Sequence, residues 1–162
     1  MSMASATDRS DALRCELAAE VLRTSGLLRL PVRGWSMLPT VWPGDTLVIE
    51  PVKSGAVRDG DIVLFSRNGR LVAHRMLAKS GSEGDAQILT RGDALSHPDL
   101  LVSDRDLLGR VAFIIRNGKS IEPSRNPRFS QRAVAALVRQ SETAARAMVR
   151  VRGMCQDSPI HT

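Results

Sequence analysis

Short apolar runs separated by Gly, Asn and Asp fill the middle of this chain, from residue 32 to about residue 121. The runs cover residues 46–52, 62–66, 71–78, 87–90 and 107–115. Apolar runs of this length, bounded by turn-forming residues, are typical of β-strands. The middle of the chain is therefore predicted to be a β-rich domain.

Two of the separators are Asn-Gly pairs, Asn68-Gly69 and Asn117-Gly118. Asn and Gly both tolerate the positive φ that a two-residue hairpin turn requires. We therefore expect two hairpins, in which residues 62–67 pair with 70–78 and residues 111–116 pair with 119–122. In the second strand of the first hairpin, alternation places Val72, His74 and Met76 on one face and Leu71, Ala73 and Arg75 on the other.

Helical spacing of apolar residues flanks this β-rich segment on both sides. Residues 11–28 follow a helical pattern that Ser10 or Asp11 could cap, and Gly26 and Pro31 mark its end. A second helical pattern covers residues 130–150, and its polar side is almost purely cationic. The predicted fold class is mainly β with flanking helices (α+β). It divides into an N-terminal amphipathic helix and lead-in (1–31), a central β domain (32–123), and a basic helix with a disordered tail (124–162).

Composition excludes several classes of protein. The formal charge is +6, and seven arginines face a single glutamate between residues 125 and 152. Only five aromatic residues are present, which disfavours a protein that stacks single-stranded nucleic acid. No run approaches the roughly 18 to 20 apolar residues of a membrane span, no secretory signal opens the chain, and Cys15 and Cys155 suggest neither a metal site nor a disulfide framework. We expect a soluble, cytoplasmic protein with no transmembrane segment and no metal or organic cofactor.

Ser36 lies in a turn that is flanked by hydrophobic residues, within the run Gly34-Trp35-Ser36-Met37-Leu38-Pro39-Thr40. A serine hydroxyl becomes a good nucleophile only when a neighbouring base accepts its proton. Of the three histidines, His161 falls in the tail and His97 in a polar loop, whereas His74 falls on a predicted strand. His74 is the best candidate base.

Six blocks in order carry a resemblance to a known family. They are Gly34–Thr40, Pro43-Gly44-Asp45, Asp59–Phe65, Val72-Ala73-His74-Arg75, Leu89-Thr90-Arg91-Gly92-Asp93 and Leu108-Gly109-Arg110-Val111. Together they resemble the type I signal peptidase family, which belongs to the serine peptidase clan that also contains the LexA-like autoproteases. Histidine at position 74 places the resemblance with the branch that uses a histidine base.

The resemblance implies a role for four residues. Ser36 would be the nucleophile and His74 the general base, and an acidic residue in or just after the Gly-Asp block would assist the histidine. Asp93 and Asp99 both fit that position. We expect Asp99 to orient His74 and Asp93 to fix the loop, and the opposite assignment stays open.

The residues around Ser36 would bind the substrate. The Ser36 N–H is the natural donor to the oxyanion of a tetrahedral intermediate. Lysine-dependent relatives carry a small hydroxyl residue two positions before the nucleophile, where this chain has Gly34, so only backbone or water could serve there. Trp35 and Met37 either line the pocket for substrate side chains or pack in the core.

The chain departs from the family pattern at its N-terminus. An amphipathic helix stands where signal peptidases carry a membrane anchor, which disfavours the usual processing of secretory precursors. The thirty or so residues before position 32 are too few for the helix-turn-helix module of LexA-like repressors, so we expect no DNA-binding domain.

The resulting prediction is a serine endopeptidase that cleaves an extended peptide or precursor protein, with leader trimming as its role. The alternatives are a non-catalytic peptide-binding scaffold of the same fold, and a basic adaptor that uses its C-terminal helix on nucleic acid or anionic lipid. Three interpretations of the cationic face of that helix remain open: it is solvated, it makes a weak contact with a membrane surface, or it contacts an acidic partner.

Overall fold

The computed structural model describes residues 6–126 of the 162-residue chain. Within this range the chain forms one long helix, α1 (Ala6–Ser25), followed by an eight-stranded sheet and two short 3-10 helices, η1 (Ser54–Ala56) and η2 (Asp104–Asp106). The strands are β1 (Leu28–Pro31), β2 (Thr46–Glu50), β3 (Ile62–Arg67), β4 (Arg70–Ser80), β5 (Gln87–Arg91), β6 (Val102–Ser103), β7 (Leu107–Arg116) and β8 (Lys119–Ile121).

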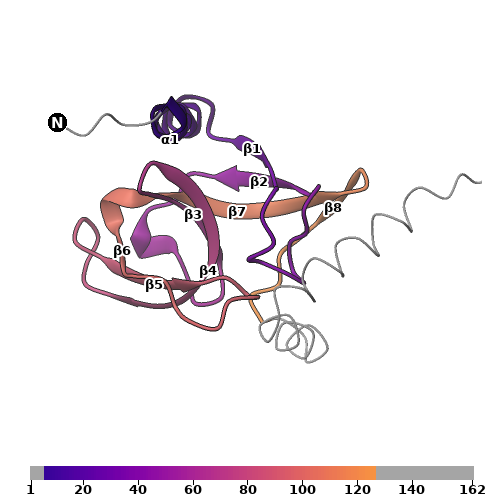
Figure 1. Cartoon of the computed structure of the whole chain (residues 1–162). Coiled ribbons are helices and arrows are strands. Elements are labelled where there is room, and N and C mark those ends of the chain that lie inside the picture. The colour runs from indigo at the N-terminus through magenta and orange to yellow at the C-terminus, as the bar shows by residue number, and fades with distance from the viewer. Residues whose placement is uncertain (1–5, 127–162) are drawn as a thin grey trace, which may run out of the picture.

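All strand pairs are antiparallel, in the order β1-β2-β7-β3-β4-β5-β6, and β8 pairs with β7. The sheet curves strongly, and α1 lies against one side of it (Figure 1), in contact with β1, β4 and β7. β5 pairs with β4 only from Arg75 onward. The first half of β4 therefore has a free edge on that side, within the part of the chain that the structure describes.

Both predicted hairpins are present. β3 pairs with β4 from Ile62 opposite Arg75 to Arg67 opposite Arg70, and β7 pairs with β8 across the second Asn-Gly turn. Asn68 and Asn117 both have φ of 50°, and the glycines that follow them have φ of 72° and 73°. These values match the type I′ turn, whose twist suits the right-handed twist of the paired strands.

The core has two parts, one on each side of β3. Ile62 and Leu64 pack with residues of β2 and β7, and Leu22 of α1 closes this cluster. Val63 and Phe65 point the other way and pack with Met76 and Ile88. Because successive side chains of a strand alternate between faces, a continuous apolar run such as β3 is what a strand buried on both faces requires.

Two elements differ from the sequence-based prediction. The helical pattern predicts a helix over residues 11–28, but the helix ends at Ser25 and Leu28–Pro31 forms β1. Gly26, with φ of 66°, separates the two elements, as glycine does at helix ends. β6 was not predicted at all. The helix expected over residues 130–150 lies outside the described residues.

The helix α1 carries several charged residues. Over residues 6–126, no helix has the length and apolar character that crossing a membrane requires.

Candidate active site

Ser36 begins a turn between β1 and β2, and the segment after β5, residues 92–94, packs against that turn. The Ala94 N–H donates a 2.9 Å hydrogen bond to the Ser36 carbonyl. Gly92 lies so close that a Cβ added to it would sit 2.5 Å from the same carbonyl oxygen. The turn and this segment therefore fit together only with glycine at position 92.

His74 lies on β4 with both ring nitrogens in contact with other functional side chains. Its Nε2 is 3.0 Å from the Oγ of Ser36, and its Nδ1 is 2.7 Å from the Oδ2 of Asp99. The His74 side chain is buried, and the Phe65 ring packs edge-on against it at 6.1 Å. The structure thus aligns Ser36, His74 and Asp99 in one hydrogen-bonded row, which we call the triad.

Asp99 is held in place by its own backbone and by neighbouring side chains. Its N–H donates to the carbonyl of Thr90 at 2.8 Å, and the Thr90 hydroxyl donates to its Oδ2 at 2.7 Å. The guanidinium of Arg67 is 3.8 Å from its Oδ1. Burial raises the pKa of Asp99, but the hydrogen bonds from His74 and Thr90, with the charges of His74 and Arg67, outweigh burial and hold that pKa below its ordinary value.

An ionised Asp99 determines the tautomer of His74. A carboxylate only accepts hydrogen bonds, so Nδ1 must carry the proton that it shares with Asp99. Neutral imidazole then presents its unprotonated Nε2 to Ser36. This is the arrangement in which Ser36 can donate its hydroxyl proton to the ring.

Asp93 lies apart from this row and makes a different set of contacts. Both of its carboxylate oxygens accept 2.8 Å hydrogen bonds from Arg75, and the Thr40 hydroxyl donates to it at 2.5 Å. Arg75 and Asp93 are both buried. A buried pair of this kind costs about 3 to 5 kcal/mol when one partner is removed. The pair ties β4 to the loop after β5 and to the turn that contains Ser36.

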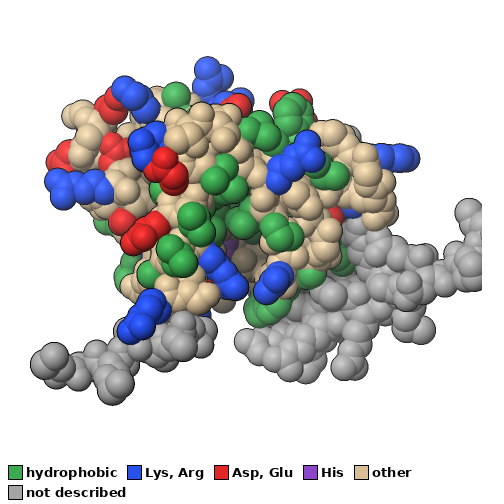
Figure 2. Space-filling model, turned by 90° about the horizontal axis from the view of Figure 1, so that it is seen from above, with side chains coloured by type: hydrophobic (Ala, Val, Ile, Leu, Met, Phe, Trp, Pro, Cys, Tyr) green, Lys and Arg blue, Asp and Glu red, His purple; other side chains and the backbone are tan. Residues whose placement is uncertain are grey.

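A pocket of about 340 Å³ opens beside Ser36 and His74, and we call it the serine pocket. It is lined by residues 30–34 and 71–74, with Ser36, Met37, Val41 and Leu47. In Figure 2 a histidine side chain is visible at the bottom of a hollow, with hydrophobic side chains around it and basic ones at the rim. The pocket is therefore mostly apolar and lies between the edges of β1 and β4.

The three residues predicted to surround the nucleophile fall in different places. Gly34 lines the serine pocket, and a Cβ added to it would meet nothing within 4 Å. Met37 both lines the pocket and packs in the core. Trp35 is half-buried and is not part of the pocket wall. Within residues 6–126, the N–H of Ser36 donates to no protein acceptor.

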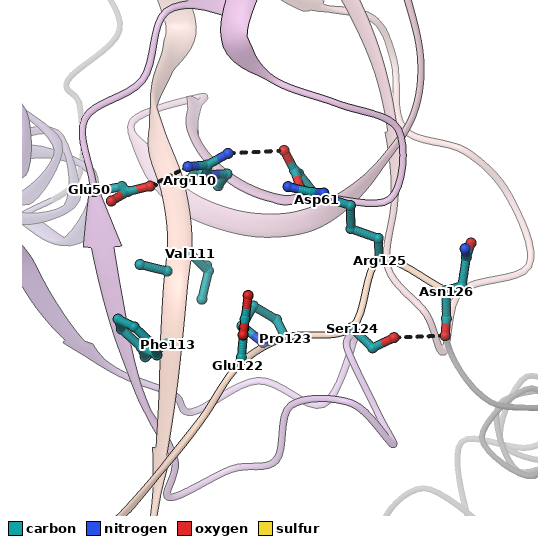
Figure 3. A pocket seen from close by; sticks show the side chains of 11 residues that line it. Glu50, Asp61, Arg110, Val111, Phe113, Glu122, Pro123, Ser124, Arg125 and Asn126 are labelled. Atoms are coloured by element: carbon teal, nitrogen blue, oxygen red, sulfur yellow. Dashed lines mark hydrogen bonds and ion pairs between the residues drawn. The ribbon is translucent and has the colours of Figure 1, made fainter.

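A larger pocket of about 630 Å³ lies elsewhere, beside β2, β7 and residues 122–126 (Figure 3). The buried Asp61 faces Arg110 and Arg125 there, with N–O distances of 3.6 Å and 2.5 Å, and Arg110 also pairs with Glu50. Four of the charged residues that line this pocket, Glu50, Asp61, Arg110 and Arg125, are thus paired with one another. It contains no member of the triad.

Three residues of the site went unrecognised in the sequence. Thr90 and Arg67 contact Asp99, and Thr40 contacts Asp93. Thr40 and Thr90 belong to the blocks that carry the family resemblance, but their spacing along the chain gives no sign of these contacts. Asp45 and Asp61, which also belong to these blocks, accept hydrogen bonds from the backbone N–H groups of Trp42 and Arg58 at 2.7 Å and 3.0 Å.

Over the described range, no three His, Cys, Asp or Glu side chains are grouped to hold a metal ion.

Comparison with known proteins identifies the family. The chain has no match among curated proteins. The family model described as Peptidase S24-like matches residues 3–112, which is more than half of the chain. The protein therefore belongs to the Peptidase S24-like family, within the clan of LexA-like and signal-peptidase-like proteins.

Proposed function

We propose that this protein is a serine endopeptidase in which Ser36 is the nucleophile, His74 the general base and Asp99 the residue that orients the base. The observation that carries the proposal is the hydrogen-bonded row itself, with 3.0 Å between Ser36 and His74 and 2.7 Å between His74 and Asp99. Both distances are within hydrogen-bonding range for proton transfer. Membership of a peptidase family supports the same reaction class.

In the proposed mechanism, Ser36 Oγ attacks the carbonyl carbon of a peptide bond while its proton passes to Nε2 of His74. The protonated imidazole is stabilised by Asp99 and then delivers its proton to the leaving amine, so that the C–N bond breaks and an acyl-serine remains. Water, deprotonated by the same nitrogen, then attacks the ester and releases Ser36. Burial of His74 limits competition from solvent for these transfers.

The oxyanion that forms in each attack needs hydrogen-bond donors. The Ser36 N–H is available, since it has no protein acceptor within residues 6–126. Gly34 offers no side-chain donor, so a second donor would come from the backbone or from water. One preorganised donor contributes about 3 to 4 kcal/mol to such a transition state, which makes the Ser36 N–H the main candidate.

The substrate in this proposal is a peptide in extended form. Within residues 6–126, β1 pairs only with β2, and β4 has β3 on one side but no partner on its β5 side from Arg70 to His74. Two strand edges therefore flank the serine pocket. A peptide placed between them could add backbone hydrogen bonds, as in other cases of strand addition. The family resemblance adds an expectation of small side chains next to the cleaved bond, and trimming of a leader from a precursor is the role that we propose.

Mass spectrometry of a peptide library after exposure to the protein tests this function. The wild-type protein should cleave a subset of peptides internally, and Ser36→Ala should leave the same peptides intact. A matched variant, Ser66→Ala, changes a half-buried serine of β3 that lines neither the serine pocket nor the larger pocket and should cleave as the wild type does. Peptides that bind but stay intact with the wild type would support a non-catalytic scaffold instead, and equal cleavage by Ser36→Ala would exclude Ser36 as nucleophile.

A further inference from the structure

A second pocket adjoins the serine pocket and carries a strong positive charge. It is lined by Asp11 and Arg14 of α1, by Arg33 and Gly34, and by Arg70 and its neighbours, and we call it the arginine pocket. The two pockets share Leu30, Pro31, Arg33, Gly34 and Leu71 as walls. They therefore form one continuous depression that leads away from Ser36.

One carboxylate faces three guanidinium groups in the arginine pocket. Asp11 is 3.0 Å from Arg14 and 3.4 Å from Arg70, so it neutralises part of their charge. Arg33 is exposed and, within residues 6–126, has no acidic or hydrogen-bonding partner. Positive charge is therefore in excess in the arginine pocket, and Arg33, at the point where the two pockets meet, is the arginine whose charge no carboxylate there offsets.

The position of the arginines fits a peptide that runs along β4. Arg70 precedes His74 by four residues on the same strand, and strands rise by about 3.3 Å per residue, which places it roughly 13 Å along the strand from the base. A peptide bound in extended form between the strand edges would bring a side chain there about three to five residues from the cleaved bond.

We propose, building on the peptidase function above, that the arginine pocket is a specificity subsite for an acidic side chain of the substrate. Arg33 makes the main contact, and Arg14 and Arg70 add to the field. The helix α1 then has a role in recognition, because it supplies Arg14 and the carboxylate that positions Arg14 and Arg70. Arg can pair with a carboxylate in a planar, two-point geometry, which favours Glu or Asp over a neutral side chain.

The test uses decapeptide mixtures in which Glu, Gln or Lys is fixed at each position in turn, with cleavage by the wild-type protein as one readout. Glu should be preferred three to five residues from the cleaved bond, by about threefold over Gln and roughly tenfold over Lys, as expected of a partly exposed ion pair. The preference should shrink as KCl rises from about 0.05 M to about 0.5 M. Arg33→Glu should reverse it, whereas Arg29→Glu, an equal charge change on an exposed residue outside both pockets, should not.

A second readout separates this inference from the proposed function. Fluorescence anisotropy measures binding of the labelled Glu and Gln mixtures to Ser36→Ala, where no cleavage can occur. Preferential binding of Glu peptides without cleavage by the wild type would contradict the peptidase function and leave the subsite intact. Cleavage or binding without any preference for acidic peptides would overturn the subsite. If, in that case, the protein attaches to phosphatidylglycerol vesicles and Arg33→Glu abolishes the attachment, the arginine pocket would be a lipid-binding site instead.

Discussion

The Nδ1 of His74 lies 2.7 Å from the Oδ2 of Asp99, while the neighbouring acidic residue Asp93 is paired with Arg75, the residue that follows His74 on β4. Both carboxylates come from the same loop region after β5, yet they have separate partners. Asp99 contacts the candidate base, and Asp93 fixes the position of the loop against β4. The sequence-based assignment, in which Asp99 orients His74 and Asp93 fixes the loop, stays a prediction.

Replacement of Asp99 by Asn should lower kcat by roughly 10³- to 10⁴-fold. The Asn amide no longer requires a proton on Nδ1 of His74. The imidazole can then adopt the other tautomer, with its proton on the Nε2 that faces Ser36, and in that form it cannot act as a base. Steady-state cleavage of a library-derived peptide measures this change. The exposed Asp59 provides a control, and an equal loss in Asp59→Asn would contradict the role of Asp99.

The pH dependence of stability should also report on Asp99. Its native pKa is lowered, by hydrogen bonds that outweigh burial, so the unfolded chain binds its proton first as pH falls. The stabilisation from Asp99 is therefore fully present above the unfolded pKa of about 3.9 and is lost as pH falls through the lower native pKa. The free energy of unfolding, measured with urea between about pH 6 and pH 2.5, should fall less steeply with decreasing pH for Asp99→Asn than for the wild type. Parallel curves would exclude this contribution.

Gly92→Ala should impair catalysis much more than folding. Its Cβ would lie 2.5 Å from the Ser36 carbonyl oxygen, where ordinary contact begins at 3.4 Å, so the Ser36 turn must move by about 1 Å. A displacement of that size can cost about 10²-fold in rate. Gly55→Ala is the matched control, because its Cβ would meet only the end of the exposed Glu83 side chain. Full activity in Gly92→Ala would show that the turn does not depend on this contact.

Gly34→Ser should increase the rate. Position 34 has open space for a Cβ, and the new hydroxyl would reach the region where the oxyanion forms. A preorganised hydrogen-bond donor to the oxyanion raises kcat by about 10²- to 10³-fold. The hydroxyl added by Gly34→Ser is not preorganised by its surroundings, so we expect a gain of about tenfold in kcat. Gly34→Ala adds the same Cβ without the hydroxyl, so equal rates in the two variants would show that the hydroxyl donates nothing to the transition state.

The sequence predicted the hairpins well because their signals are local. Asn68-Gly69 and Asn117-Gly118 each specify a turn through their own backbone preferences. It failed at β1, where Leu27 and Leu28 continue the helical spacing of α1 and only pairing with β2 makes Leu28 part of a strand. Tertiary pairing of that kind overrides a local pattern.

The site was predictable in part for the same reason. Ser36 and His74 stand out by residue type and by their surroundings in the sequence, and the structure brings them within 3.0 Å. Thr90 could not be assigned a role, because its hydroxyl matters only once β5 and the loop after it place Asp99 beside it. The arginine pocket was equally hidden, since its residues come from α1, β4 and the segment after β1.

Covalent trapping of Ser36 tests the central claim most directly. A peptide phosphonate diphenyl ester, built on a sequence that the protein cleaves, phosphonylates a serine nucleophile with loss of phenol. Intact-mass measurement and peptide mapping of the wild type should show one adduct per chain, on Ser36, formed much more slowly in His74→Gln and absent from Ser36→Ala. An adduct that forms equally well in Ser36→Ala, or a wild-type protein that cleaves the parent peptide while its Ser36 stays unmodified, would contradict the account.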